Sequence, residues 1–156
     1  MQSAKAGFDR AIDWLNVAAH VLAAATVVRR SGTNALVKFD GQRDNDKVYT
    51  VFVGRGEDDE SRFREDSDDL EELVTRAFPL STEQSLDDAV PLSGMLQRLH
   101  ALASEGFVVC IYMAWLADAV AYSVDIMGEL GVFNPIHVEG QALLEIMQQS
   151  VQQFDQ

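Results

Sequence analysis

The sequence predicts an α+β protein, a single domain over residues 1–156 that is mostly helical, with about five helices and one β-hairpin. Three observations lead to this prediction. Apolar residues recur at helical spacing in several long segments, two short segments have the composition of strands, and no change in composition marks a second domain. A chain of 156 residues is long enough to bury one sizeable core.

The first predicted helix covers residues 4–29, where Phe8, Ile12 and Leu15 share one face. Gly32 is expected to end it, since glycine adopts the left-handed conformation that commonly follows the last helical residue. The second half of this helix is apolar on every side, so we expect it to be buried all round.

Two strands are predicted next, over residues 34–39 and 47–53, joined by a loop rich in Gly, Asn and Asp. The second strand is apolar on both faces, which favours a position covered on both sides. A two-stranded hairpin is marginally stable alone. We therefore expect this one to pack against helices or to gain a third strand from residues 107–112.

The most apolar segment, residues 107–127, contains only two charges, Asp118 and Asp125. We interpret it as a strand over residues 107–112, or else the start of a helix, followed by a helix that runs to about residue 130. A membrane span is not expected, because Asp118 would lie at its midpoint.

The remaining elements are an acidic loop and three helices. Residues 54–66 are predicted to form a mobile, solvated loop. A helix follows with Ser67 as its N-cap and ends at Pro79. Further helices are expected over residues 91–105, with proline at the first position, and over residues 139–154, with glutamines on the exposed side.

The net charge of the chain limits the classes of partner that it can bind. It has 25 acidic and 12 basic residues, a net charge of −13. Such a field repels the phosphates of nucleic acids and anionic membranes, and it attracts basic protein surfaces. We therefore expect no direct nucleic-acid binding, no membrane binding, and a basic protein as partner.

Cys110 is the only cysteine, which excludes an internal disulfide and predicts a cytoplasmic location. Its apolar neighbours predict a buried, unreactive thiol. His20 is the last polar position before the apolar half of the first helix, and we expect it to be a hydrogen-bonded structural histidine.

No catalytic motif is present. The sequence lacks a Gly-x-Ser-x-Gly elbow, a Glu-x-x-His or His-x-x-x-His pair, and a phosphate-binding glycine loop. We predict a protein that is not an enzyme and that has no cofactor and no metal. The alternative is a small metal-dependent hydrolase, in which Asp118, Asp125 and Glu129 share one face of the predicted helix.

The candidate site is the acidic run over residues 57–72, which has ten acidic residues and two arginines. It is either a solvated loop that only keeps the protein soluble, or a recognition surface for a basic partner, for which clustered carboxylates provide steering and complementarity. An apolar residue within the run is a possible interface anchor. The residues expected to contact the partner are Glu57, Asp58, Asp59, Glu60, Phe63, Asp66, Asp68 and Asp69.

These features predict a non-enzymatic acidic binding protein that neutralises or escorts a toxin, an effector or a nucleic-acid-binding protein. It would be of the immunity, inhibitor or secretion-chaperone type. In size, acidity and the order of helix and hairpin the chain is loosely similar to type III secretion chaperones, but it has none of their motifs. Two alternatives are an inhibitor that imitates nucleic acid and a structural module that self-associates through its glutamine-rich last helix.

Overall fold

The computed structural model describes residues 6–56, 63–81 and 86–156. These residues form one short 3-10 helix, four α-helices and six β-strands. In chain order the elements are η1 (Ala6–Phe8), α1 (Trp14–Ser31), β1 (Asn34–Asp40), β2 (Tyr49–Gly54), β3 (Phe63–Ser67), α2 (Leu70–Ala77), α3 (Leu86–Ser104), β4 (Val108–Leu116), β5 (Ala119–Met127), β6 (Ile136–Gly140) and α4 (Leu143–Asp155).

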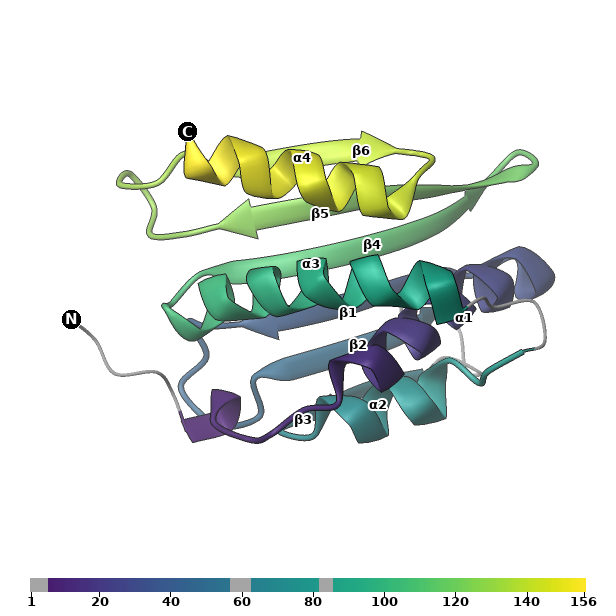
Figure 1. Ribbon diagram of the computed structural model, residues 1–156, viewed down its shortest axis with the longest axis horizontal. Coiled ribbons are helices and arrows are strands. Elements are labelled where there is room, and N and C mark those ends of the chain that lie inside the picture. The colour runs from purple at the N-terminus through teal and green to yellow at the C-terminus, as the bar shows by residue number, and fades with distance from the viewer. Residues whose placement is uncertain (1–5, 57–62, 82–85) are drawn as a thin grey trace.

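The strands form one antiparallel sheet in the order β3-β2-β1-β4-β5-β6. Four α-helices of the described chain lie on the same face of this sheet (Figure 1). The described residues therefore form two layers, and none of their helices lies on the second face of the sheet. This arrangement is common for antiparallel sheets, in which one face packs on the core and the other meets solvent.

The core lies between the sheet and the helices. Along β1 the side chains of Ala35, Val37 and Phe39 are buried, whereas Leu36 and Lys38, which point to the other face, are only partly covered. The same alternation of period two continues into β4, which pairs with β1. The register of the sheet is thus fixed by the row of apolar side chains that faces the helices.

The predicted fold class is wrong in its proportions. The described residues are about 29% strand and 43% helix, and six strands replace the single hairpin. Only the broader α+β class is confirmed. The predicted third strand near residues 107–112 is correct, because β4 pairs with β1 over six residues.

The main error concerns the helix predicted from residue 113 to about residue 130, because residues 113–127 continue the β4–β5 hairpin. Ile111 and Val124 face each other across it and both are buried on the helix side of the sheet. Asp118 lies in the two-residue turn, next to Ala117, whose φ of 57° is the left-handed conformation that tight hairpin turns use. The apolar residues thus follow a period of two, which outweighs the helical spacing of the carboxylates.

The helices α1 and α2 begin at other residues than predicted, because other side chains cap their N-termini. α1 begins at Trp14 and not at residue 4, because the side chain of Asp13 accepts a hydrogen bond from the backbone N–H of Asn16. It ends as predicted, with Gly32 at φ 63°. In α2 the N-cap is Asp69 and not Ser67, since the Asp69 carboxylate accepts from the Glu72 N–H.

Three other predicted segments begin or end elsewhere. Residues 63–66, part of the predicted acidic loop, belong to the edge strand β3, while residues 57–62 lie outside the described residues. α3 begins at Leu86, so that Pro91 lies inside it and not at its first position. α4 begins at Leu143, because residues 136–140 form β6.

None of the helices in the described part of the chain has the length and apolar character that crossing a membrane requires.

Candidate functional site

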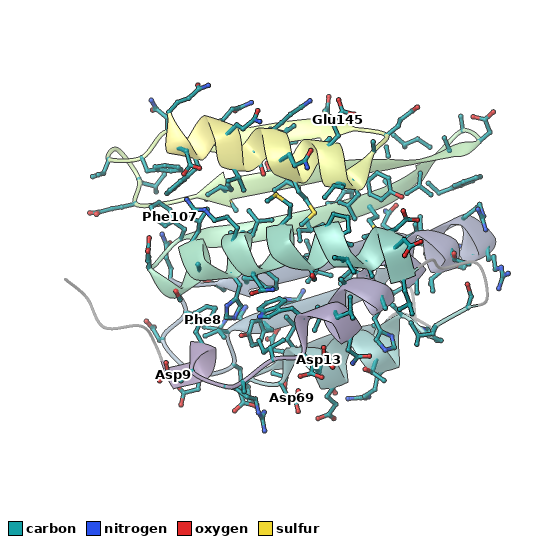
Figure 2. All side chains as sticks on the ribbon, viewed as in Figure 1. Phe8, Asp9, Asp13, Asp69, Phe107 and Glu145 are labelled. Carbon is teal, nitrogen blue, oxygen red and sulfur yellow. The ribbon has the colours of Figure 1, made fainter. Side chains whose placement is uncertain are left out.

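The described half of the acidic run lies at one corner of the molecule, where β3, the first turn of α2 and the β1–β2 loop meet. We call this surface the acidic corner. Asp69, Asp9 and Asp13 lie in the lower part of Figure 2, whereas Glu145 lies at the upper edge. The predicted contacts Glu57, Asp58, Asp59 and Glu60 precede β3 in the chain and lie outside the described residues. The carboxylates of the acidic corner are Asp46, Glu65, Asp66, Asp68, Asp69, Glu71 and Glu72.

Asp66 is held in place by its neighbours on the sheet. The hydroxyl of Thr50 donates a hydrogen bond to its Oδ1 atom over 2.5 Å, and the Arg43 guanidinium lies 3.5 Å from the same oxygen. Partial burial would raise the pKa of this carboxyl, but the Thr50 hydrogen bond and the positive charges of Arg43 and Arg64 together lower it. Asp66 is therefore ionised and already paired.

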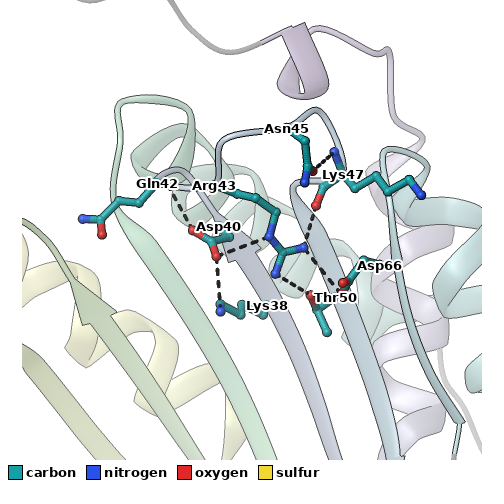
Figure 3. A network of polar contacts seen from close by, with 8 residues as sticks. All are labelled: Lys38, Asp40, Gln42, Arg43, Asn45, Lys47, Thr50 and Asp66. Atoms are coloured by element: carbon teal, nitrogen blue, oxygen red, sulfur yellow. Dashed lines mark hydrogen bonds and ion pairs between the residues drawn. The ribbon is translucent and has the colours of Figure 1, made fainter.

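Arg43 connects three parts of this corner (Figure 3). Its guanidinium donates to the backbone oxygen of Lys47 over 2.6 Å and to the hydroxyl of Thr50 over 3.1 Å. Its Nε atom lies 3.6 Å from the carboxylate of Asp40, which in turn lies 3.2 Å from the Lys38 ammonium. A single planar cation thus fixes the β1–β2 loop against β3, a task for which its fork of donors is suited.

The next carboxylates tie the N-terminal segment to α2. Arg10 lies 3.4 Å from Asp68 and 3.5 Å from Asp69. The carboxylate of Glu71 accepts a hydrogen bond of 2.9 Å from the backbone N–H of Asp13. Because Asp13 and Asp69 are also the N-caps of α1 and α2, both helices begin at this contact.

Phe63 is not placed as an exposed anchor. It pairs with Val53 on the helix side of the sheet and packs, half-buried, against the core. The guanidinium carbon of Arg76 lies 5.4 Å from the centre of its ring, and the same guanidinium pairs with Glu65 and, at 3.7 Å, with Glu72. The aromatic ring is covered by a cation and contributes to stability here.

Two hollows flank the N-terminus of α2 on this corner. The larger, of about 700 Å³, is lined by residues that include Asp46, Asp66 and Asp68. The smaller, of about 350 Å³, is lined by residues that include Asp69 and Glu71. Beside them, β3 pairs only with β2 among the described strands, so its outer edge is open. The corner thus combines carboxylates, concave surface and an unpaired strand edge.

The carboxylates considered for a metal site are not brought together. Asp118 lies in the β4–β5 turn, while Asp125 lies seven residues further along β5, roughly 20 Å away at the rise of a strand. Glu129 follows the end of β5. Within the described parts of the chain, no group of three or more His, Cys, Asp or Glu side chains has a geometry that would hold a metal ion.

Of the side chains considered for that metal site, which also included His137 or Glu139, Asp125 and His137 are brought together, as a hydrogen-bonded pair across two strands. Its Oδ1 atom lies 2.5 Å from Nδ1 of His137, and Nε2 of His137 lies 3.3 Å from Glu139. Asp125 and His137 are register partners on β5 and β6. The hydrogen bonds that the imidazole donates to Asp125 and then to Glu139 raise the pKa of His137. The alternation His137–Val138–Glu139 was the only sign in the sequence that these side chains share one side of a strand.

The uncovered face of the sheet is the second surface that the sequence did not reveal. Phe52, Leu36 and Tyr112 lie side by side on it in register, from β2 through β1 to β4. Tyr112 is 37% exposed, and Leu116 at the end of β4 is 61% exposed. Cys110 lies on the same face, and its burial raises the pKa of its thiol to about 11, as expected for an unreactive cysteine.

Other predicted side chains have structural roles. His20 is buried, and its Nδ1 atom lies 2.7 Å from the carbonyl oxygen of Phe78, to which it donates a hydrogen bond because a carbonyl only accepts. This confirms the expected structural histidine. The glutamines of α4 are exposed, as predicted.

Comparison of the chain with known protein families, with curated protein sequences and with solved structures gives no significant match. The function is therefore inferred from the surfaces described above.

Proposed function

We propose that this chain is a non-enzymatic binding protein that neutralises or escorts a basic protein partner, which it takes up at the acidic corner. The observation that supports this most is the location of the carboxylates. They lie on and beside β3, whose outer edge has no partner among the described strands. An edge strand offers unpaired backbone groups to which another chain can add.

Binding begins with electrostatic steering. A net charge of −13 raises the local concentration of cationic segments and speeds their association. An extended segment of the partner then adds along β3, so that backbone hydrogen bonds supply affinity. Its lysine and arginine side chains enter the two hollows beside α2, where the carboxylates lie. Occlusion of this basic segment would prevent the partner from acting on its own target.

The carboxylates of the corner divide into structural and available ones. Asp66 and Asp69 serve the Arg43 network and the cap of α2. Asp68 and Glu72 have side chains that are 58% and 59% exposed, and their ion pairs are of the surface type, which contribute little and exchange readily. We assign contact with the partner to Asp68 and Glu72. We also assign it to residues 57–60, because all four of them are acidic. The sole cysteine, with its raised pKa, suits a reducing compartment such as the cytoplasm.

The test compares two variants that each lose five negative charges. In the corner variant the acids become amides at Glu57, Asp58, Asp59, Glu60 and Asp68. In the control variant the same change is made at five exposed positions elsewhere, which are Glu105, Asp118, Glu129, Glu145 and Asp155. Affinity capture from host extract at low salt should retain a basic protein on wild type and control, and lose it from the corner variant.

The captured protein is then purified and titrated calorimetrically against all three chains. We expect an affinity at least about tenfold weaker for the corner variant alone, since several charge pairs are lost together. Equal affinity for the corner and control variants would show that only the net charge matters and would refute the assigned site. If wild type retains no basic protein, the proposed function is wrong.

A further inference from the structure

A row of side chains crosses the uncovered face of the sheet and carries opposite charges at its two ends. Arg64 begins it on the edge strand β3, and Glu139 ends it on the opposite edge strand β6; both are exposed. Each member is the direct register partner of the next. In order, the row is Arg64, Phe52, Leu36, Tyr112, Ser123 and Glu139.

The row of one copy is complementary in charge to the same row of a second copy that runs in the reverse direction. The sheet has three strands on each side of the line between β1 and β4. A two-fold axis above this line and parallel to the strands reverses the row, as symmetric dimer interfaces require. It sets Arg64 of one copy over Glu139 of the other, and Phe52 over Ser123. In the neighbouring row the same axis sets Asp66 over His137.

The arriving phenylalanine meets a hollow in the opposite surface. This hollow has a volume of about 560 Å³ and lies at the β4–β5–β6 end of the uncovered face. Its lining includes the side chains of Tyr112, Leu116 and Ser123, and also Glu139. An aromatic ring fills such an apolar hollow well, and the guanidinium that follows it along the row reaches the carboxylate in the same wall.

We propose that the uncovered face of the sheet is a homodimer interface, in which Phe52 of each copy enters the hollow of the other and Arg64 pairs with Glu139. The guanidinium of Arg64 makes no hydrogen bond or ion pair with the described residues, although its charge helps to lower the pKa of Asp66, so it is available. Glu139 has one described polar contact, at 3.3 Å to His137, and its side chain is 78% exposed.

The size of the face limits the affinity. Six strands at about 4.8 Å spacing and roughly five residues long give a flat area on the order of 500 Å² for each copy, about 1,000 Å² in total, which is the size of a weak, transient interface. The net charge of −13 on each copy also opposes association. We therefore expect a dimer with a Kd in the micromolar range, on the order of 1–100 µM.

Sedimentation equilibrium from low micromolar to about 1 mM protein tests this, at physiological salt so that the net repulsion is screened. The mass should rise from 17.2 kDa toward twice that value. Arg64→Glu and Glu139→Arg should each weaken the dimer at least about tenfold, and the double variant, with its charges exchanged, should restore it. Glu145→Arg on α4 makes the same charge change on the helix side and should leave the dimer intact.

Leu116→Glu tests the hollow itself without disturbing the core, since Leu116 is 61% exposed. It should abolish the dimer while circular dichroism stays unchanged. A wild type that remains monomeric at every concentration would overturn the proposal, and so would a dimer that Arg64→Glu leaves unaffected. A dimer broken only by Gln149→Arg would place the contact on α4 and also overturn it. The inference does not rest on the proposed function, because a monomer that still captures a basic protein refutes only the dimer.

Discussion

The Nε2 atom of His100 lies 2.5 Å from the hydroxyl oxygen of Tyr49, and this contact joins α3 to β2 inside the core. Phe8, Trp14 and Phe39 surround the same imidazole, with ring centres 4.8–5.6 Å from it. Four other elements, β2, η1, α1 and β1, thus contact this one histidine of α3, and its burial lowers the pKa of the imidazole to about 4.

His100 should make the protein lose stability in weak acid. The imidazole of His100 binds a proton near pH 6.5 in the unfolded chain but only near pH 4 in the folded chain. Above pH 6.5 the imidazole is neutral in both states and costs no stability. As the pH falls below 6.5 the unfolded chain takes up the proton first, so the free energy of unfolding decreases. Between pH 6.5 and 5 we expect the free energy of unfolding to fall by roughly 1.5 kcal/mol. Urea titrations at several pH values measure it.

The variant His100→Gln isolates this effect, because it keeps a polar group near Tyr49 and cannot titrate. Its free energy of unfolding should be nearly flat between pH 6.5 and 5, where few carboxylates change charge. If wild type and variant lose stability in parallel over this interval, His100 is not the cause.

Two glycines should respond oppositely to substitution by alanine. A Cβ atom on Gly41 would lie 2.0 Å from the backbone oxygen of Ala103 and 2.6 Å from that of Phe107, so Gly41→Ala should cost about 3 kcal/mol or more. Gly94 lies inside α3 with nothing within 4 Å of a Cβ, so Gly94→Ala should stabilise the protein by up to about 1 kcal/mol. The denaturation midpoints of the two variants measure both; a mild Gly41→Ala would mean that the β1–β2 loop does not approach α3 so closely.

The sequence predicted those elements whose signal is local. The first two strands and the end of α1 at Gly32 were found because alternation and a helix-ending glycine are read within a few residues. The β4–β5 hairpin also had its signal, in the alternation of Val109, Ile111 and Met113, but spacing of four between Asp118 and Tyr122 favoured a helix. An apolar segment of this length allows both interpretations.

Other features depend on contacts that no single segment carries. β3 reads Phe-Arg-Glu-Asp-Ser, which has almost no strand propensity, and it is a strand because β2 offers it an edge. The pairing of Asp125 with His137 and the row from Arg64 to Glu139 exist only once the register of six strands is known. The sequence predicted the charge of the candidate site. The geometry of the site could not be predicted, because it depends on how the strands and helices pack together.

Arg43 should not be replaceable by lysine. Its side chain is 18% exposed and its guanidinium contacts Asp40, Thr50 and Asp66 at once, a geometry that one ammonium group cannot reproduce. We expect Arg43→Lys to lower the free energy of unfolding by about 1–2 kcal/mol. Arg98→Lys is the matched control, because its pair with Asp155 is exposed and should change stability by less than about 0.5 kcal/mol. Equal effects in chemical denaturation would contradict the role given to the Arg43 network.

His137 should titrate above the usual pH for histidine, and Asp125 should be the main reason. The hydrogen bond that His137 donates to Asp125 is the largest contribution to the raised pKa, and Glu139 adds to it. We expect Asp125→Asn to bring the pKa of His137 back toward 6.5 and Glu139→Gln to lower it less. Two-dimensional NMR of the imidazole signals measures this directly, and an unchanged titration in Asp125→Asn would show that the pair does not form in solution.

The sign of this second linkage is opposite to that of His100. A histidine whose pKa is raised in the folded state stabilises the protein fully below pH 6.5, and it loses this contribution as the pH rises through the raised value. Because the side chain of His137 is 54% exposed, the effect is small beside that of His100. The pH profile of stability should therefore rise between pH 5 and 6.5 through His100 and decline slightly above it, and His137→Gln should remove only the decline.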